Sequence, residues 1–475
     1  MAVVMSEKAQ IGLIGLGTMG ANLSLNIAEK GFPIAVFNRT TSRTDDFHAG
    51  AGTLAEAITP CHTLEAFVAA IQSPRAIILM VPAGEAVDAQ IDALLPLLNS
   101  DDLIIDAGNA NFHETNRRAA AADARGAPYL GIGVSGGEEG ARHGPAIMGG
   151  GKREAWNRVA PVLEAIAARY EDTPCATWLG ESGTGHFVKT VHNGIEYADM
   201  QMIAEIYSIM HDGYGMTSSA IGDVFAQWNE GPLKSYLIEI SAEVTRAADR
   251  ETGRPVMDII LDRAGQKGTG RWTVIEAQQL GAAIPCIEAA VSARNLSAQL
   301  PDRKTGEALF GPSLRPFGDG NPDIGMLERA LIAGKILCYA QGFSLLKAAA
   351  KAYEWDLSLP DVARVWRAGC IIRSTMLNDM AAAFTTDPDT NLMFAETFSP
   401  ILKENEPQLR DVVLKATGAG IPLPALASAQ FYFDMMRTGR SSANMIQAQR
   451  DFFGAHSFER VDQPGSHHGP WNSGV

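Results

Sequence analysis

The stretch QIGLIGLGTMGANLSLNIAEKG, residues 10–31, joins a short apolar run, a glycine-rich turn and a segment of helical period. In such a strand–turn–helix unit the first glycine of GxGxxG permits a tight turn, and the second lets backbone N–H groups approach a pyrophosphate. The third packs the helix against the strand, and the helix N-terminus favours phosphate. A glycine turn without a ligand is the alternative, but the flanking elements favour a dinucleotide site. Its candidate contacts are Gly15, Gly17, Thr18, Met19 and Gly20.

The next apolar run, PIAVF, ends in Asn38-Arg39-Thr40. An NAD site usually places a carboxylate here to hold the ribose hydroxyls, and a carboxylate would repel a 2′-phosphate. A neutral residue followed by an arginine, whose planar fork suits phosphate, favours NADP instead. An ordinary surface arginine is the alternative interpretation of Arg39.

Residues 10–180 alternate short apolar runs with helical patterns, which predicts a Rossmann-type, doubly wound α/β parallel sheet. The expected strands are QIGLIG, PIAVF, AIILMV, LIIDAG and YLGIGV. Long Ala-, Leu- and Ile-rich helical patterns then dominate. We therefore expect a nucleotide-binding domain over residues 1–182, a large all-helical substrate and dimerisation domain over 183–440, and a polar tail over 441–475. Such tails are disordered unless something ties them down.

Composition excludes several classes of protein. The 475 residues carry a net charge of −15, whereas nucleic-acid binders and proteins of anionic membranes need excess Lys and Arg. A small phosphorylated ligand is not excluded. The sequence shows neither a spanning segment nor a secretory signal. Its five cysteines are scattered without CxxC spacing, which predicts reduced thiols in the cytoplasm. We expect no bound metal, because no His, Cys or carboxylate group has ligand spacing.

Two further loops follow expected strands, and ligands of open α/β sheets bind beyond the carboxyl ends of strands. IDAGN ends in Asn109, and VSGGEEG contains Ser135, Gly136 and Gly137. The Ser-Gly-Gly turn exposes backbone N–H groups that suit an anion such as a carboxylate. A plain turn is the alternative.

The segment KTVHNGIEY gathers polar side chains on one side of a predicted helix. At about 100° per residue, five of them fall within an arc of roughly 140°. They are Lys189, His192, Asn193, Glu196 and Tyr197. A solvated face is the alternative, but Asn and Gly are poor helix formers, so we interpret this side as a pocket wall. In the loop QKGTG, Lys267 and Thr269 combine a cation with a hydroxyl. Arg294 lies in an apolar stretch and either pairs with a carboxylate or binds a ligand.

Over nearly its whole length, the chain resembles the 6-phosphogluconate dehydrogenases, which are NADP-dependent and decarboxylating. The resemblance is carried by GLGTMG, FNRT, GVSGGEEGA, VKTVHNGIEYADMQ, DRAGQKGTGRWT, LCYAQGF, RAGCIIRS and IQAQRDFFGAH. It implies an enzyme of the pentose phosphate pathway and of gluconate use, which converts 6-phosphogluconate to ribulose 5-phosphate and CO2 with reduction of NADP.

The resemblance also implies roles for individual residues. Lys189 would be the general base and Glu196 the acid that protonates the enediol. Ser135, Gly136, Gly137 and His192 would hold the carboxylate, while Asn109 and Asn193 would contact hydroxyls. Tyr197, Lys267, Thr269 and Arg294 would hold the phosphate. The cofactor would be contacted by the glycine turn and by Asn38, Arg39, Thr40, Val81 and Asn109.

The family further implies a homodimer in which Arg450 and His456 of each tail complete the partner subunit's site. Two positions depart from the family pattern: Pro82 stands where Lys is common, and Ala107 where Gly is usual. Two other functions stay open. One is a 3-hydroxyacid dehydrogenase of the 3-hydroxyisobutyrate type, and the other is an inactive relative that serves as a binding protein.

Overall fold

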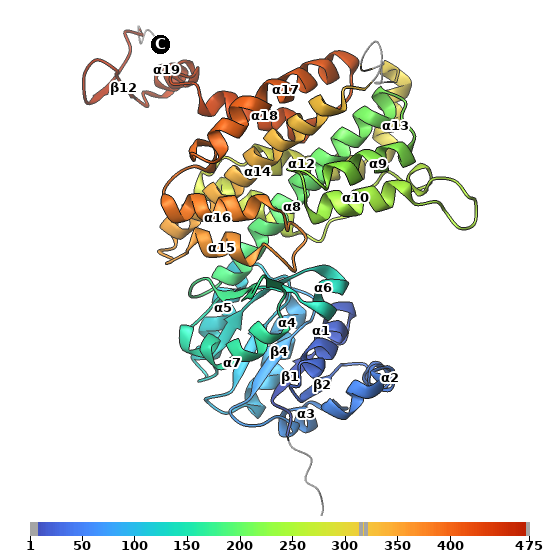
Figure 1. The fold of residues 1–475 in the computed structure, drawn as a ribbon. Helices are drawn as coiled ribbons and strands as arrows, with labels where there is room; N and C mark the ends of the chain where they lie inside the picture. Colours follow the sequence, from blue (N-terminus) through green and yellow to red (C-terminus); the bar gives the residue numbers. More distant parts are fainter. Residues whose placement is uncertain (1–7, 313–316, 318–321, 472–475) are drawn as a thin grey trace, which may run out of the picture.

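The computed structural model of the chain describes residues 8–312, 317 and 322–471. Figure 1 shows a body built around a sheet, a second body of packed helices, and a terminal segment that extends away from those helices. An α/β part followed by a large helical part was predicted, and this is confirmed. In the described part of the chain, no helix is both long enough and apolar enough to cross a membrane.

The α/β body contains a six-stranded parallel sheet with strand order β3-β2-β1-β4-β5-β6. The strands are β1 Ile11–Ile14, β2 Ile34–Phe37, β3 Ile58–Cys61, β4 Ala76–Leu79, β5 Leu103–Asp106 and β6 Tyr129–Gly131. Ile14 pairs with Phe37 on one side and Leu79 on the other, and Leu79 pairs with Asp106. The carboxyl ends of β2, β1, β4 and β5 therefore lie side by side at one edge.

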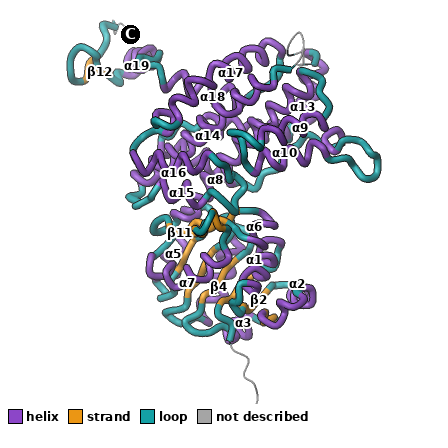
Figure 2. The backbone as a smooth tube through the Cα atoms, in the orientation of Figure 1, coloured by secondary structure: helices purple, strands orange, loops and turns teal. Residues whose placement is uncertain are grey.

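Helices cover both faces of this sheet, as Figure 2 shows. Alternate residues of β1 point to opposite faces, as strand geometry requires. Leu13 packs in one apolar cluster with Leu23 and Trp156, and Ile14 packs in another with Phe67 and Ile91. The helices of this body are α1 Thr18–Glu29, α2 Thr41–Gly50, α3 Leu64–Ala70, α4 Glu85–Leu94, α5 Phe112–Asp123, α6 Gly137–His143 and α7 Arg153–Ile166.

Two strands differ from the expectation. The edge strand β3 was missed, because its sequence ITPC carries Pro60 and lacks a clear apolar run; proline is tolerated at a sheet edge. The expected single strand YLGIGV was wrong, since it breaks at Ile132 into β6 and β7 Gly133–Ser135. β7 joins a separate three-stranded sheet with β8 Ala146–Gly149 and β11 Ala176–Trp178. This break turns Ser135 out of the main sheet and toward the helical body.

The helical body is organised around α8 Thr184–Ser208, which runs from the sheet into the centre of the helices (Figure 1). It packs against β7, β8, α11, α12, α14 and α18. The remaining helices of this body are α9 Ser218–Trp228, α10 Tyr236–Arg246, α11 Thr269–Leu280, α12 Pro285–Ser297, α13 Leu300–Phe310, α14 Ile324–Ala352, α15 Leu359–Val365, α16 Met376–Thr386, α17 Phe398–Ala419 and α18 Pro424–Met436. Because neighbours surround α8, Lys189, His192 and Asn193 are buried and Glu196 is partly buried.

The terminal segment begins with α19 Ala443–Gly454 and continues through β12 Phe458–Glu459 and β13 Ser466–His467. The two strands pair antiparallel as a small hairpin. The tail is therefore folded as far as Trp471, although much of its surface is exposed. Met445, Ile446, Phe452 and Phe453 are each 59% exposed or more.

Candidate active site

The glycine-rich turn has the geometry that its sequence predicted. Gly15 has φ +104°, and a Cβ there would overlap the Met80 carbonyl. A Cβ at Gly20 would overlap the Gly15 carbonyl, whereas Gly17 faces open space. Gly17 also precedes the first turn of α1, which Thr18 and Met19 begin. The close contacts require glycine at positions 15 and 20. The open space at Gly17 leaves room for a phosphate at the helix N-terminus.

The end of β2 lies beside this turn. The Asn38 side chain accepts a hydrogen bond from Leu16 N–H at 3.0 Å and donates one to the Thr40 carbonyl at 3.1 Å. Asn38 therefore ties the end of β2 to the glycine-rich turn. Arg39 and Thr40 are exposed just beyond it, at the start of α2.

The ends of β4 and β5 complete this edge. A Cβ at Gly108 would lie 3.1 Å from the Val81 carbonyl, so the two loops touch. Asp106 is buried; it accepts from Gly108 N–H at 3.1 Å and from the Tyr129 hydroxyl at 3.0 Å. This carboxylate holds the turn that presents Asn109 at the surface. Of the two departures from the family pattern, Pro82 is exposed, while the Ala107 methyl is buried.

A buried polar cluster lies where β7 meets α8. Lys189 Nζ donates to Ser135 Oγ at 2.8 Å, and Ser135 Oγ lies 3.2 Å from His192 Nε2. His192 Nδ1 lies 3.0 Å from Asn193 Oδ1 and 3.8 Å from Glu196 Oε2. Lys189, His192 and Asn193 are all less than a tenth exposed. The pocket-wall interpretation of this helix face thus accounts for their burial, whereas a solvated face does not.

Burial dominates the electrostatics of this cluster. Burial lowers the pKa of Lys189, and the nearby Glu196 carboxylate opposes this shift. Burial likewise raises the pKa of Glu196, against the charges of Lys189 and Arg294. The pKa of His192 is held well below its ordinary range by burial and by Lys189, so its ring is neutral. The two groups therefore shift toward neutral amine and protonated acid, the forms that a base and an acid need.

Close packing makes this arrangement possible. A Cβ at Gly133 would overlap the Lys189 side chain, and a Cβ at Gly136 would lie 2.6 Å from the Gly369 carbonyl. The Trp366 ring packs edge-on to His192, with ring centroids 5.7 Å apart. Sequence reasoning did not assign Gly133, Trp366 or Gly369 to the site. The motif RAGCIIRS contains Gly369 and directly follows Trp366, but nothing in its local pattern places it beneath Ser135 and Gly136.

The predicted phosphate-side residues gather at the start of α11. The Arg294 guanidinium stacks on the Tyr197 ring at 3.4 Å and donates to the Gly265 carbonyl at 3.2 Å. A Cβ at Gly270 would lie 2.5 Å from the same ring. Burial lowers the pKa of this guanidinium, while Tyr197 and the nearby Glu196 carboxylate favour the protonated form of Arg294. Thr269 is buried at the start of α11, and Lys267 is exposed in the preceding loop.

Arg450 and His456 do not join this cluster within one chain. Both lie on the terminal segment, which Figure 1 shows extending away from the helical body. Both side chains are exposed. In this arrangement of one chain, neither side chain lies beside Lys189.

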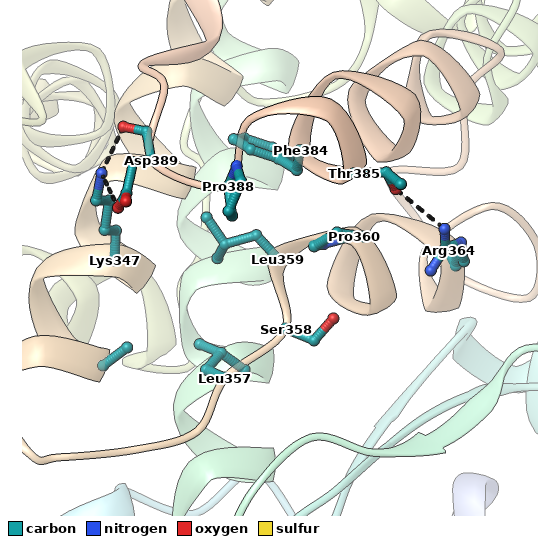
Figure 3. Close-up of a pocket in the computed structure, with 11 residues that line it drawn as sticks. Lys347, Leu357, Ser358, Leu359, Pro360, Arg364, Phe384, Thr385, Pro388 and Asp389 are labelled. Atoms are coloured by element: carbon teal, nitrogen blue, oxygen red, sulfur yellow. Dashed lines mark hydrogen bonds and ion pairs between the residues drawn. The ribbon is translucent and has the colours of Figure 1, made fainter.

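A separate cleft of about 490 Å³ lies between the end of α14, α15 and α16. Figure 3 shows that its charged groups are already paired: Lys347 with Asp389, and Arg364 with Thr385. It contains none of the residues that the sequence predicted for function. In the part of the chain that the structure describes, no group of three or more His, Cys, Asp or Glu side chains could hold a metal ion.

The doubly wound sheet, its glycine-rich turn and the buried lysine cluster together define a nicotinamide-nucleotide-dependent dehydrogenase. Residues 10–180 match the family described as the NAD binding domain of 6-phosphogluconate dehydrogenase, and residues 185–471 match its C-terminal domain. The chain belongs to the 6-phosphogluconate dehydrogenase family.

Individual relatives agree with this assignment. A decarboxylating, NADP(+)-dependent 6-phosphogluconate dehydrogenase of Bacillus subtilis is 45% identical over 98% of this chain and 99% of its own length. A second protein of that organism, named as NAD(+)-dependent, is 44% identical over 97% of this chain and 99% of its own length. Solved structures of Plasmodium falciparum 6-phosphogluconate dehydrogenase have a TM-score of 0.93 at 40% identity and cover 97% of this chain and 100% of theirs. The resemblance seen in the sequence is confirmed.

Proposed function

We propose that this chain catalyses the oxidative decarboxylation of 6-phospho-D-gluconate to D-ribulose 5-phosphate and CO2, with reduction of NADP, in the pentose phosphate pathway. The observation that carries the proposal is the buried chain of contacts from Lys189 through Ser135 to His192, beside Glu196. It lies next to the sheet edge that presents the dinucleotide turn. The names of the relatives supply the substrate class.

NADP fits the edge of the sheet. The turn of Gly15, Gly17 and Gly20 suits the pyrophosphate, and Arg39 beyond β2 suits a 2′-phosphate. Bound there, NADP+ would accept the hydride from the third carbon of the substrate. Because relatives of similar identity are named for NADP and for NAD, the choice of cofactor depends on individual residues such as Arg39.

Lys189 acts as the general base in this proposal. Its lowered pKa supplies a neutral amine that takes the proton from the third-carbon hydroxyl as hydride leaves. The protonated amine then stabilises the oxyanion that develops when the 3-keto acid loses CO2. The ketone accepts the electron pair of the breaking bond, so we expect no metal requirement.

Glu196 acts as the acid. Its raised pKa keeps a proton on a carboxyl group close to His192, ready for the carbon that becomes C1 of ribulose 5-phosphate. His192 is neutral. A Ser135 hydroxyl donating to His192 Nε2, with His192 Nδ1–H donating to Asn193 Oδ1, gives both ring nitrogens of the neutral imidazole a partner.

Substrate binding divides between two ends of the site. We assign the carboxylate to the Ser-Gly-Gly turn and His192, where Gly136 and Gly137 have positive φ and the turn's N–H groups suit an anion. The hydroxyls are assigned to Asn109 and Asn193. The phosphate is assigned to the other end, with Tyr197, Lys267, Thr269 and Arg294. Stacking on Tyr197 and the bond to Gly265 hold Arg294 in place for this role.

The proposal includes a homodimer in which each tail reaches the partner subunit's site and supplies Arg450 and His456. The apolar side chains of α19, among them Phe452 and Phe453, are exposed and need a surface to cover them. The loop containing Ile259, Ile260 and Leu261 is also exposed and apolar, close in sequence to Lys267. In this division residues 1–182 bind the cofactor, residues 183–440 bind substrate and dimerise, and residues 441–475 reach the partner. The five buried free cysteines support a reducing, cytoplasmic location.

The deciding experiment is turnover of 6-phosphogluconate with NADP+, followed by absorbance of NADPH and by release of CO2. Wild type should turn over. Lys189→Ala should abolish hydride transfer, and Glu196→Gln should slow product formation. A chelator should leave the wild-type rate unchanged. Turnover of 3-hydroxyisobutyrate but not 6-phosphogluconate would support the shorter-dehydrogenase alternative, and no turnover of either would support the inactive relative.

Mixed dimers test the shared site. Assayed at 6-phosphogluconate concentrations well below the KM of the Arg450→Ala variant, Lys189→Ala and Arg450→Ala homodimers should each be nearly inactive. In a heterodimer of the two, one site carries both defects and the other carries neither, so activity should return to as much as about half of wild type. Verified heterodimers without activity would show that the tail acts on its own subunit.

A further inference from the structure

Residues 457–471 follow His456 and fold back onto α19. Their centre is the carboxylate of Asp451, which is only 3% exposed in an otherwise exposed tail. Its Oδ1 accepts from Ser457 N–H at 2.8 Å and lies 2.7 Å from His468 Nδ1. Its Oδ2 accepts from Gly469 N–H at 2.9 Å and Trp471 Nε1–H at 2.7 Å. One side chain thus gathers four donors from the end of the chain.

These contacts hold a charged carboxylate. The Gly469 N–H, followed by Trp471, His468 and Ser457, keeps the pKa of Asp451 well below its usual range. Hydrogen bonds to an ionised acceptor are stronger and more directional than neutral ones. Residues 457–471, which we call the hook, are therefore fixed to α19 through one residue.

The hook also fixes the positions of Arg450 and His456, the two tail residues assigned to the substrate phosphate. His456 lies between Ala455 and Ser457, whose φ values are +51° and +58°. Left-handed backbone at two non-glycine residues persists only where surrounding contacts impose it, and the Asp451–Ser457 bond is such a contact. The His456 ring lies over Gly454, where an added Cβ would be 2.5 Å from its Nε2.

Gln447 connects Arg450 to the same unit. Its amide N–H donates to the Ser457 carbonyl at 2.6 Å, and its carbonyl accepts from Arg450 Nη1 at 3.0 Å. Arg450 and His456 are thus tied to one another through Ser457. Figure 1 shows this unit well apart from both bodies, so its internal contacts have no part in folding the sheet or the helical body.

We propose that residues 457–471 form a positioning hook, organised by Asp451, that holds Arg450 and His456 in register to grip the phosphate of the substrate bound in the partner subunit. The inference rests on the proposed function. Preorganised ligands lose less conformational freedom on binding, so the hook acts on substrate affinity. Asp451 is a positioning residue, because it touches Arg450 and His456 only through Ser457 and Gln447.

The test replaces Asp451 by Asn, which keeps the size but removes the charge and turns an NH2 toward the donors. KM for 6-phosphogluconate should rise at least about tenfold, as for loss of a charged hydrogen bond to phosphate, with kcat and KM for NADP little changed. The inhibition constant of inorganic phosphate should rise in parallel. The matched control is Asp462→Asn in the same hook. Asp462 is paired with the exposed Arg460 at the surface of the hook, so this variant should keep wild-type values of KM and kcat.

A double-variant background separates the possible outcomes. When Arg450 and His456 are both Ala, adding Asp451→Asn should change KM no further; an additional rise would mean that Asp451 acts elsewhere and would overturn the inference. If Arg450→Ala and His456→Ala raise KM but Asp451→Asn does not, the hook is wrong and the proposed function stands. If neither Ala variant affects KM, the assignment of the tail to the phosphate fails.

Sedimentation must show that each variant remains a dimer. Should Asp451→Asn dissociate, Trp471→Phe replaces it, since this change removes one donor and keeps the ring. A dimeric Trp471→Phe enzyme should raise KM in the same direction by a smaller factor. Wild-type KM in that dimer would also overturn the inference.

Discussion

Replacing Gly133 by Ala should damage catalysis although it removes no polar group. The added Cβ would overlap the Lys189 side chain and lie 3.0 Å from both Lys189 Cγ and the Gly185 carbonyl. Its closest contact, with Lys189 Cβ, is far inside the ordinary carbon–carbon separation of about 3.5–4.0 Å, so strand and helix must separate by roughly 1 Å or more. Lys189 Nζ holds Ser135 Oγ at 2.8 Å, and a shift of this size stretches that bond. Displacements near 1 Å cost about 100-fold in rate, so kcat should fall by roughly 10- to 100-fold.

The control is Gly149→Ala, in the same three-stranded sheet. Its Cβ would lie 2.5 Å from a Trp156 ring carbon and 3.0 Å from the Thr177 carbonyl, away from Lys189. Both variants should lose about 1–3 kcal/mol of stability from overpacking, measured by urea unfolding. Only Gly133→Ala should also lose kcat in the NADPH assay. Equal kcat values for the two variants would refute the idea that the β7–α8 contact positions the base.

Three further outcomes follow from the site. Arg39→Ala should raise KM for NADP by one to two orders of magnitude, because it loses roughly 1.5–3 kcal/mol of charged hydrogen bonding. KM for NAD should stay unchanged. Equal use of both cofactors by the wild-type enzyme would contradict this assignment. Because the pKa of Lys189 is lowered and that of Glu196 raised, kcat/KM should rise with pH as Lys189 loses its proton and fall as Glu196 loses its own; Glu196→Gln should remove the alkaline limb. Burial raises the pKa of Glu205 from 4.5 to about 7, so between these values the folded state keeps a proton that the unfolded state has lost. The free energy of unfolding should therefore fall by up to about 1.4 kcal/mol per pH unit across this interval, and Glu205→Gln should flatten that slope in urea titrations.

The parts of the site that the sequence predicted well depend on local geometry. The glycine turn follows from three residues in a strand–turn–helix context, and the contact that requires Gly20, with the Gly15 carbonyl, lies within the turn itself. The side-chain grouping on α8 follows from helical period alone. Both patterns are complete within about ten residues, so no long-range information is needed to detect them.

The parts that were missed depend on contacts between distant segments. Gly369 lies beneath Gly136, and Trp366 packs on His192, across more than 150 positions of sequence. Arg294 illustrates the same limit: from sequence it was as compatible with a structural ion pair as with a ligand. Its stacking on Tyr197 could not be read from the sequence, because it arises from the packing of α12 against α8.

The tail shows why a polar composition does not by itself predict disorder. Residues 457–471 bury little apolar surface, and composition alone would leave them unfolded. Asp451 compensates, because a buried carboxylate gathers four donors that the chain end would otherwise expose to water. Folding by polar contacts leaves the apolar side chains of α19, Phe452 and Phe453 among them, on the outside. A unit with satisfied polar groups inside and apolar groups outside is suited to insertion between two subunits, which is where the proposed function requires Arg450 and His456 to act.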